Sequence, residues 1–175
     1  MVLCALCAAL TCILAPVSIP TPGGVPVSLA TFTVMLSGLL LGEKLGTMSQ
    51  LIYILLGCAG LPVFAGWTGG IGLVLGMTGG YILGYLFLAF FTGFFYFHMG
   101  KKKTGGERYF WMILGMASGT LVLYAFGTVW FMHVTGMDLA ASLAACVLPF
   151  LAGDAVKIAA AAALSGQIEK ALAHV

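Results

Sequence analysis

Charged side chains are too few in this sequence to cover the surface of a water-soluble fold. Only 7 Lys and Arg and 5 Asp and Glu occur among 175 residues. Charged residues make up 7% of the chain, whereas soluble domains carry about 25%. Because hydrophobic residues make up 62%, we expect the outer surface to face lipid. This composition excludes a soluble enzyme, a disordered tail and a nucleic-acid-binding protein, and it predicts a polytopic membrane protein.

Apolar stretches separated by turn-forming and charged residues indicate six membrane-spanning helices in a single domain, residues 1–175. The separating clusters lie at 16–26, 42–44, 61–80, 100–108 and 132–138. A helical span needs about 20 apolar residues, and the ten-residue alternation of membrane β-strands is absent from the sequence. The predicted fold class is therefore an all-α membrane protein. Its expected spans are residues 2–15, 28–42, 46–60, 79–98, 109–131 and 139–172.

Lysine and arginine in the loops fall on one side of a six-span topology. The fourth loop holds residues 101–103, all Lys, and Arg108, the second loop holds Lys44, and the C-terminal tail holds Lys170. The first, third and fifth loops hold none. Because basic loops stay in the cytoplasm, we expect a cell-membrane protein with both termini inside the cell.

Two charged residues, Asp154 and Lys157, lie in the interior of the sixth stretch, well before Glu169 and Lys170 at its C-terminal end. Their spacing of three places both side chains on one helix face, and a charge near the bilayer centre costs about 2.5–3.5 kcal/mol. One interpretation is a neutralised pair that fixes this helix against its neighbours. The interpretation we favour is a polar site facing a cavity. There Asp154 would accept hydrogen bonds from ligand N–H groups, and Lys157 would hold an anionic group.

The third loop is rich in glycine and aromatic residues. Its sequence is LPVFAGWTGG at 61–70, followed by GMTGGY at 76–81. Such backbone at membrane depth is tolerated only where it is buried in protein or lines a cavity. A re-entrant loop without a ligand is one interpretation. We favour a loop that caps a ligand, with the proline-rich first loop as a second lid on the same side.

Residues for membrane catalysis or metal binding are missing from the expected spans. Asp154 is the only aspartate there, so an aspartate dyad cannot form, and paired histidines for haem do not occur. The five cysteines lie among apolar neighbours, which is typical of buried free thiols. We therefore expect no enzymatic activity, no metal and no cofactor.

Five motifs extend in order along nearly the whole chain. They are VPVSL at 25–29, GLLLG at 38–42, GCAGLPVFAG at 57–66, GMTGGY at 76–81 and PFLAGDAVK at 149–157. Together they resemble the BioY family, the biotin-binding S components of energy-coupling factor (ECF) transporters. The resemblance implies a six-helix ECF S-component-like bundle. It also implies a function as a high-affinity subunit that captures biotin at an outward-facing site.

The same resemblance implies which residues bind biotin. Asp154 matches the acid that contacts the ureido ring, and Lys157 lies close to it. Thr68 matches a polar loop position before Gly69 and Gly70, and Tyr81 matches an aromatic residue.

The sequence departs from the family at two positions. Many relatives carry Gln at the position of Ala30, and some carry Arg at that of Ile82. The group that holds the biotin carboxylate therefore stays open, with Lys157 and backbone N–H groups as candidates.

Ala5 and Ala9 form a small-xxx-small motif, which allows close approach of a second helix. The resemblance implies that this face docks a transmembrane coupling subunit, which works with two cytoplasmic ATPases.

Biotin suits a mostly apolar pocket with one acid and one cation. The alternatives are an S component for another small vitamin or, in a different class, a membrane enzyme or structural subunit.

Overall fold

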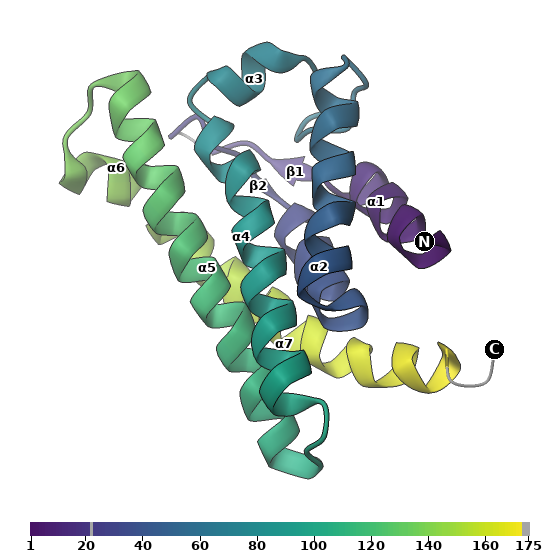
Figure 1. Cartoon of the computed structure of the whole chain (residues 1–175). Helices are drawn as coiled ribbons and strands as arrows, with labels where there is room; N and C mark the ends of the chain where they lie inside the picture. Colours follow the sequence, from purple (N-terminus) through teal and green to yellow (C-terminus); the bar gives the residue numbers. More distant parts are fainter. Residues whose placement is uncertain (22, 173–175) are drawn as a thin grey trace.

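The computed structural model describes residues 1–21 and 23–172, with side chains through Ile168, and it is predominantly helical (Figure 1). The elements are α1 (Val2–Leu14), β1 (Ser18–Ile19), β2 (Val27–Ser28), α2 (Ala30–Cys58), α3 (Ile71–Leu75), α4 (Gly79–Phe95), the π-helix η1 (Tyr96–Gly100), α5 (Gly105–Thr135), α6 (Leu139–Cys146) and α7 (Leu148–Leu172). Within the described part, α2, α4 with η1, α5 and α7 are long and apolar enough to cross a membrane, whereas α1 is a shorter apolar helix. The chain is thus a multi-pass membrane protein.

The count of six helices is not confirmed, because the described residues form seven α-helices and the expected spans 28–42 and 46–60 both lie in α2. The chain nevertheless reverses inside α2. Gly42 has φ 80° and ψ −179°, a conformation that glycine adopts without steric cost. The Gln50 Nε2 atom lies 3.0 Å from the Ser37 Oγ atom, although a straight helix would separate residues 13 apart by about 20 Å. We call the two halves the first arm (30–41) and the second arm (43–58) of α2.

The prediction of one span over 139–172 is wrong. The helix α6 ends at Cys146 and α7 begins at Leu148, because Val147 has φ −120° and ψ −53°. Asp138 caps α6, since its Oδ1 atom accepts a hydrogen bond from the Ala141 N–H at 3.3 Å. Pro149 lies in the first turn of α7, where its missing N–H has no helical partner to lose. Two separate helices therefore replace the expected single one.

Two further differences concern shorter segments. The first loop contains an antiparallel pair of short strands, β1 and β2, in which Ser18 faces Ser28 and Ile19 faces Val27, so the fold is not purely helical. The helix α5 extends beyond the expected 109–131 at both ends. The side chain of Lys170 and the C-terminus, both used in the topology prediction, lie outside the described part.

The helix α4 lies at the centre of the fold, between α2 and α5 (Figure 1). Gly93 of α4 packs directly against the backbone of Gly42 and Glu43, so a side chain there would collide with the turn of α2. Leu88 of α4 and Met116 of α5 are fully buried in the main core cluster. The short helices α3 and α6 lie at one end of the molecule, and the turn between η1 and α5 lies at the opposite end.

Candidate functional site

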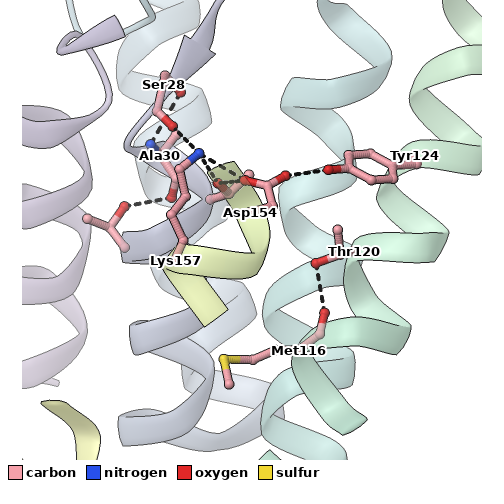
Figure 2. A network of polar contacts seen from close by, with 9 residues as sticks. Ser28, Ala30, Met116, Thr120, Tyr124, Asp154 and Lys157 are labelled. Carbon is pink, nitrogen blue, oxygen red and sulfur yellow. Dashed lines mark hydrogen bonds and ion pairs between the residues drawn. The ribbon is translucent and has the colours of Figure 1, made fainter. Parts of the chain in front are cut away.

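A buried network of polar side chains connects α7 with α5, α2 and the end of β2 (Figure 2). Asp154 is 3% exposed and Lys157 is 9% exposed. The Lys157 Nζ atom donates to the Asp154 Oδ1 atom at 2.9 Å, to Thr31 Oγ1 at 3.0 Å and to the Ser28 carbonyl at 2.7 Å. The Asp154 carboxylate also accepts from Thr31 Oγ1 at 3.0 Å and from the Tyr124 hydroxyl at 2.6 Å. Four segments of the chain therefore meet at one ion pair.

The hydrogen bonds of the network leave Asp154 able to bind a ligand but use all the donors of Lys157. All three N–H bonds of the Lys157 ammonium are directed at protein acceptors. Asp154 accepts two hydrogen bonds at Oδ1 and one at Oδ2, and a carboxylate has about four acceptor sites. Among the residues that the structure describes, one acceptor site on Oδ2 is therefore left for a donor. Mutual neutralisation explains how both charges tolerate burial.

A cavity of about 230 Å³ lies beside this network, between the first loop, α2, the third loop and α4. Its lining residues are Gly24, Val25, Pro26, Ser28, Tyr53, Phe64, Ala65, Thr68, Leu73, Thr78, Tyr81, Ile82 and Tyr85. A second cavity of about 30 Å³ reaches Asp154 and Lys157. Both cavities are lined by Val25, Pro26, Ser28, Tyr81 and Tyr85. These five residues therefore separate the ion pair from the larger cavity.

The structure brings some of the sequence-predicted residues to the cavity wall. Tyr81 lines both cavities, and its hydroxyl lies 3.1 Å from Thr128 Oγ1 on α5. Thr68 lines the larger cavity, while its hydroxyl donates to the Ala65 carbonyl at 2.8 Å. Ile82, where some relatives carry Arg, lines the same cavity and is buried. This wall is therefore apolar at the position of that Arg.

Gly69 and Gly70 shape the third loop and do not belong to the residues that line the larger cavity in the described part. Gly69 packs against the carbonyl of Leu61, where a Cβ atom would collide. Gly70 has φ 105°, and its N–H donates to the Gly57 carbonyl at 2.7 Å. These glycines therefore attach the loop to the end of α2.

Several polar residues of the site were missed by the sequence analysis, namely Ser28, Thr31, Tyr53, Tyr85 and Tyr124. Tyr85 follows Tyr81 by one helical turn, so their spacing indicates a shared face. Tyr124 lies in the middle of an expected span, where a phenol needs a partner. Ser28 and Thr31 give no such signal, because small hydroxyl residues satisfy their hydrogen bonds within any helix.

Ala5 and Ala9 lie on the exposed face of α1, whereas Cys4, Ala8 and Thr11 face the second arm of α2 and are buried. The small residues of the motif are thus available to another helix. Ala30 is buried, and its N–H donates to Ser28 Oγ at 3.2 Å.

Comparisons with known proteins agree over nearly the whole chain. The family model described as BioY family matches residues 1–174. A probable biotin transporter BioY from Pyrococcus horikoshii is 41% identical over 167 residues, which cover 95% of this chain and 94% of the relative. The biotin transporter BioY from Thermotoga maritima is 35% identical over 154 residues, covering 88% and 86%.

A solved structure shares the fold as well. The crystal structure of the S-component for biotin from an ECF-type ABC transporter matches with a TM-score of 0.87 and 29% identity, over 97% of this chain and 89% of that chain. Sequence, family model and fold all point to one group, and the chain belongs to the BioY family.

Proposed function

We infer that this protein is the biotin-binding, substrate-capture subunit of an ECF-type vitamin uptake transporter, and that it is not an enzyme. The observation that carries this function is the cavity of about 230 Å³ beside the buried pair Asp154–Lys157, in a chain whose relatives are named biotin transporters. Biotin has two ureido N–H donors, an apolar bicycle with a thioether, and a carboxylate. A mostly apolar pocket with one available carboxylate acceptor suits these groups.

Within this site we assign different roles to the two charges. Asp154 accepts a ureido N–H at its free Oδ2 position, once Tyr81 and Tyr85 move enough to join the two cavities. Lys157 orients Asp154 and does not bind the ligand directly, because its three donors are already used within the protein. Thr68 contacts the ligand from the third loop. Gly69 and Gly70 hold that loop, and backbone N–H groups there are the candidates for the biotin carboxylate.

We also propose six membrane crossings: α1, the two arms of α2, α4 with η1, α5 and α7. The reversal at Gly42 supports this arrangement, because it converts one long helix into two antiparallel arms. The four basic residues at 101–108 then lie with Lys44 on the cytoplasmic side. The helix α3 lies on the outer side, and both termini lie in the cytoplasm.

The energy for uphill transport would come from partner subunits. We propose a transmembrane coupling subunit that docks on α1 at Ala5 and Ala9, together with two cytoplasmic ATPase subunits. The exposure of both alanines supports this docking face, since helices in lipid associate through close packing of small residues.

Binding of labelled biotin to the purified protein tests the function. We expect saturable binding of one biotin per chain, with unlabelled biotin competing and thiamin and riboflavin failing to compete at the same concentrations. Thiamin is cationic and riboflavin is larger, so neither suits a small apolar cavity with one acid. Competition by another vitamin in preference to biotin would instead identify an S component of different specificity.

Cysteine labelling tests the topology. In a variant whose five native cysteines are replaced, we expect Thr68→Cys to react with a membrane-impermeant thiol reagent in intact cells and Thr104→Cys to resist it. Both positions are exposed. Thr68 shortly precedes α3 and Thr104 lies in the turn between η1 and α5, and α3 and this turn lie at opposite ends of the fold. Biotin should slow the reaction at position 68, because Thr68 lines the cavity. Permeabilised cells, in which both positions should react, provide the control, and the reverse pattern would contradict the topology.

A further inference from the structure

The proposed function does not use the end of the molecule where η1 and α5 meet. A groove of about 730 Å³ opens there, at the opposite end from α3 and α6 (Figure 1). Apolar and charged side chains line it together: His98, Met99, Lys103, Glu107, Phe110 and Trp111. A groove with both kinds of side chain suits an amphiphilic ligand.

The apolar part of the groove is open to its surroundings. Phe110 is 59% exposed and Met99 is 42% exposed, and Trp111 is half-buried beside them. Tryptophan is enriched where hydrocarbon meets lipid headgroups. This part of the groove therefore suits the first carbons of a lipid chain.

The chain segment that contributes Lys103 and Glu107 to the groove is cationic as a whole. The segment 100–108 has four basic residues and one acid, which gives a net charge of 4 − 1 = +3. Lys101 is fixed over the ring of Phe97 at 4.0 Å, and Arg108 lies 5.6 Å from the ring centroid of Tyr96. Lys103 lines the groove itself, together with the exposed ring of His98. The irregular turn of η1 brings these groups together, and π-helical turns are frequent at functional sites.

We propose that this groove binds one anionic phospholipid of the cytoplasmic leaflet. The headgroup phosphate lies at Lys103 and His98, and an acyl chain lies along Phe110 and Trp111. A soluble anion would leave the apolar part uncovered, and an uncharged hydrocarbon would leave the net positive charge of the segment 100–108 unbalanced. The cytoplasmic leaflet carries the negative lipids that attract such basic segments. The choice of leaflet depends on the topology proposed above, and biotin binding plays no part in the argument.

The carboxylate of Glu107 repels an anion in this groove. Its Oε2 atom lies 3.1 Å from Lys103 Nζ, and the two side chains are 68% and 51% exposed. Exposed pairs of this kind contribute little to stability, so a phosphate can replace Glu107 as the partner of Lys103. The pair also offers a matched test, because removing either member breaks the same ion pair but changes the charge of the groove in opposite directions.

Native mass spectrometry of the purified protein tests the proposal. The protein in detergent is titrated with an equal mixture of phosphatidylglycerol and phosphatidylcholine of identical acyl chains, and the first bound lipid is identified. We expect a preference for phosphatidylglycerol of about fivefold, the effect of one lysine near a membrane surface. Lys103→Gln should remove most of this preference, and Glu107→Gln should increase it. Lys44→Gln, which removes a charge beside the turn between the two arms of α2, should leave the lipid preference unchanged.

Four outcomes would overturn the proposal. Equal binding of the two lipids would mean that the groove has no headgroup site. A shift in the same direction for Lys103→Gln and Glu107→Gln would mean that only the ion pair matters. Displacement of the lipid by glycerol phosphate or inorganic phosphate would identify a soluble anion as the ligand. If the lipid preference is unaffected and Lys103→Gln instead weakens co-purification with the coupling subunit, the groove is a protein contact.

Discussion

Asp154→Asn is expected to lose biotin binding by more than tenfold and to destabilise the biotin-free protein. Loss of a charged acceptor for a buried N–H donor costs about 1.5–3 kcal/mol, and 1.4 kcal/mol corresponds to a factor of ten in affinity. The substitution also leaves the Lys157 ammonium buried without its counter-charge, which costs about 3–5 kcal/mol. Equilibrium binding of labelled biotin measures the first effect, and thermal unfolding in detergent without biotin measures the second.

The double variant Asp154→Asn with Lys157→Met separates the two effects. It removes both charges, so we expect the unfolding temperature to return toward that of the wild type. Biotin binding should stay weak, because the carboxylate acceptor is still missing. Normal binding by the double variant would show that the ion pair only holds α7 against α2 and α5. In that case the ligand site would lie elsewhere in the cavity.

Replacing Ala5 and Ala9 together by Leu is expected to abolish biotin uptake and leave biotin binding intact. Both residues lie on the exposed face of α1, so the larger side chains disturb no internal packing. They would hold the coupling subunit away from the α1 backbone, and close packing is the main attraction between helices in lipid. Co-purification of the coupling subunit and uptake of labelled biotin into cells should both fall to background.

A matched control uses the same substitution on another helix. Ala125 is exposed on α5, so Ala125→Leu adds equal bulk to a face that we do not assign to the coupling subunit. This variant should form the complex and transport normally. Normal uptake by the Ala5→Leu, Ala9→Leu protein would instead mean that these residues face lipid. Equal loss with Ala125→Leu would mean that added bulk harms the complex regardless of position.

Two breaks between helices were predicted from glycine and charged residues, because these residue types favour turns. Gly42 takes a positive φ inside the predicted break at 42–44, and the basic segment 100–108 contains the turn before α5. The break at Val147 was missed, because an alanine-rich apolar run surrounds it on both sides. Pro149 was the available signal, since the first turn is where a helix tolerates proline.

Part of the candidate site was predictable, because charged residues are rare in a membrane-spanning segment. Asp154 and Lys157 are costly in a membrane, and the structure shows them paired. Their other partners, Thr31 and Tyr124, come from helices whose orientation around α7 depends on tertiary packing. The spacing of residues along one helix does not reveal which other helix that face packs against. For that reason the sequence predicted the pair but not the network that occupies all the donors of Lys157.

The unequal lengths of the helices have a consequence for the surrounding bilayer. The 13 residues of α1 extend about 20 Å, whereas the 22 residues of α4 with η1 extend about 33 Å, and the hydrocarbon core is about 30 Å thick. In the six-crossing arrangement proposed above, the membrane would thin beside α1 and return to its normal thickness beside α4. Hydrophobic mismatch of this kind favours helix association. A coupling subunit on α1 would cover the thinned region, so the elastic energy of the lipid itself would help to hold the transporter together.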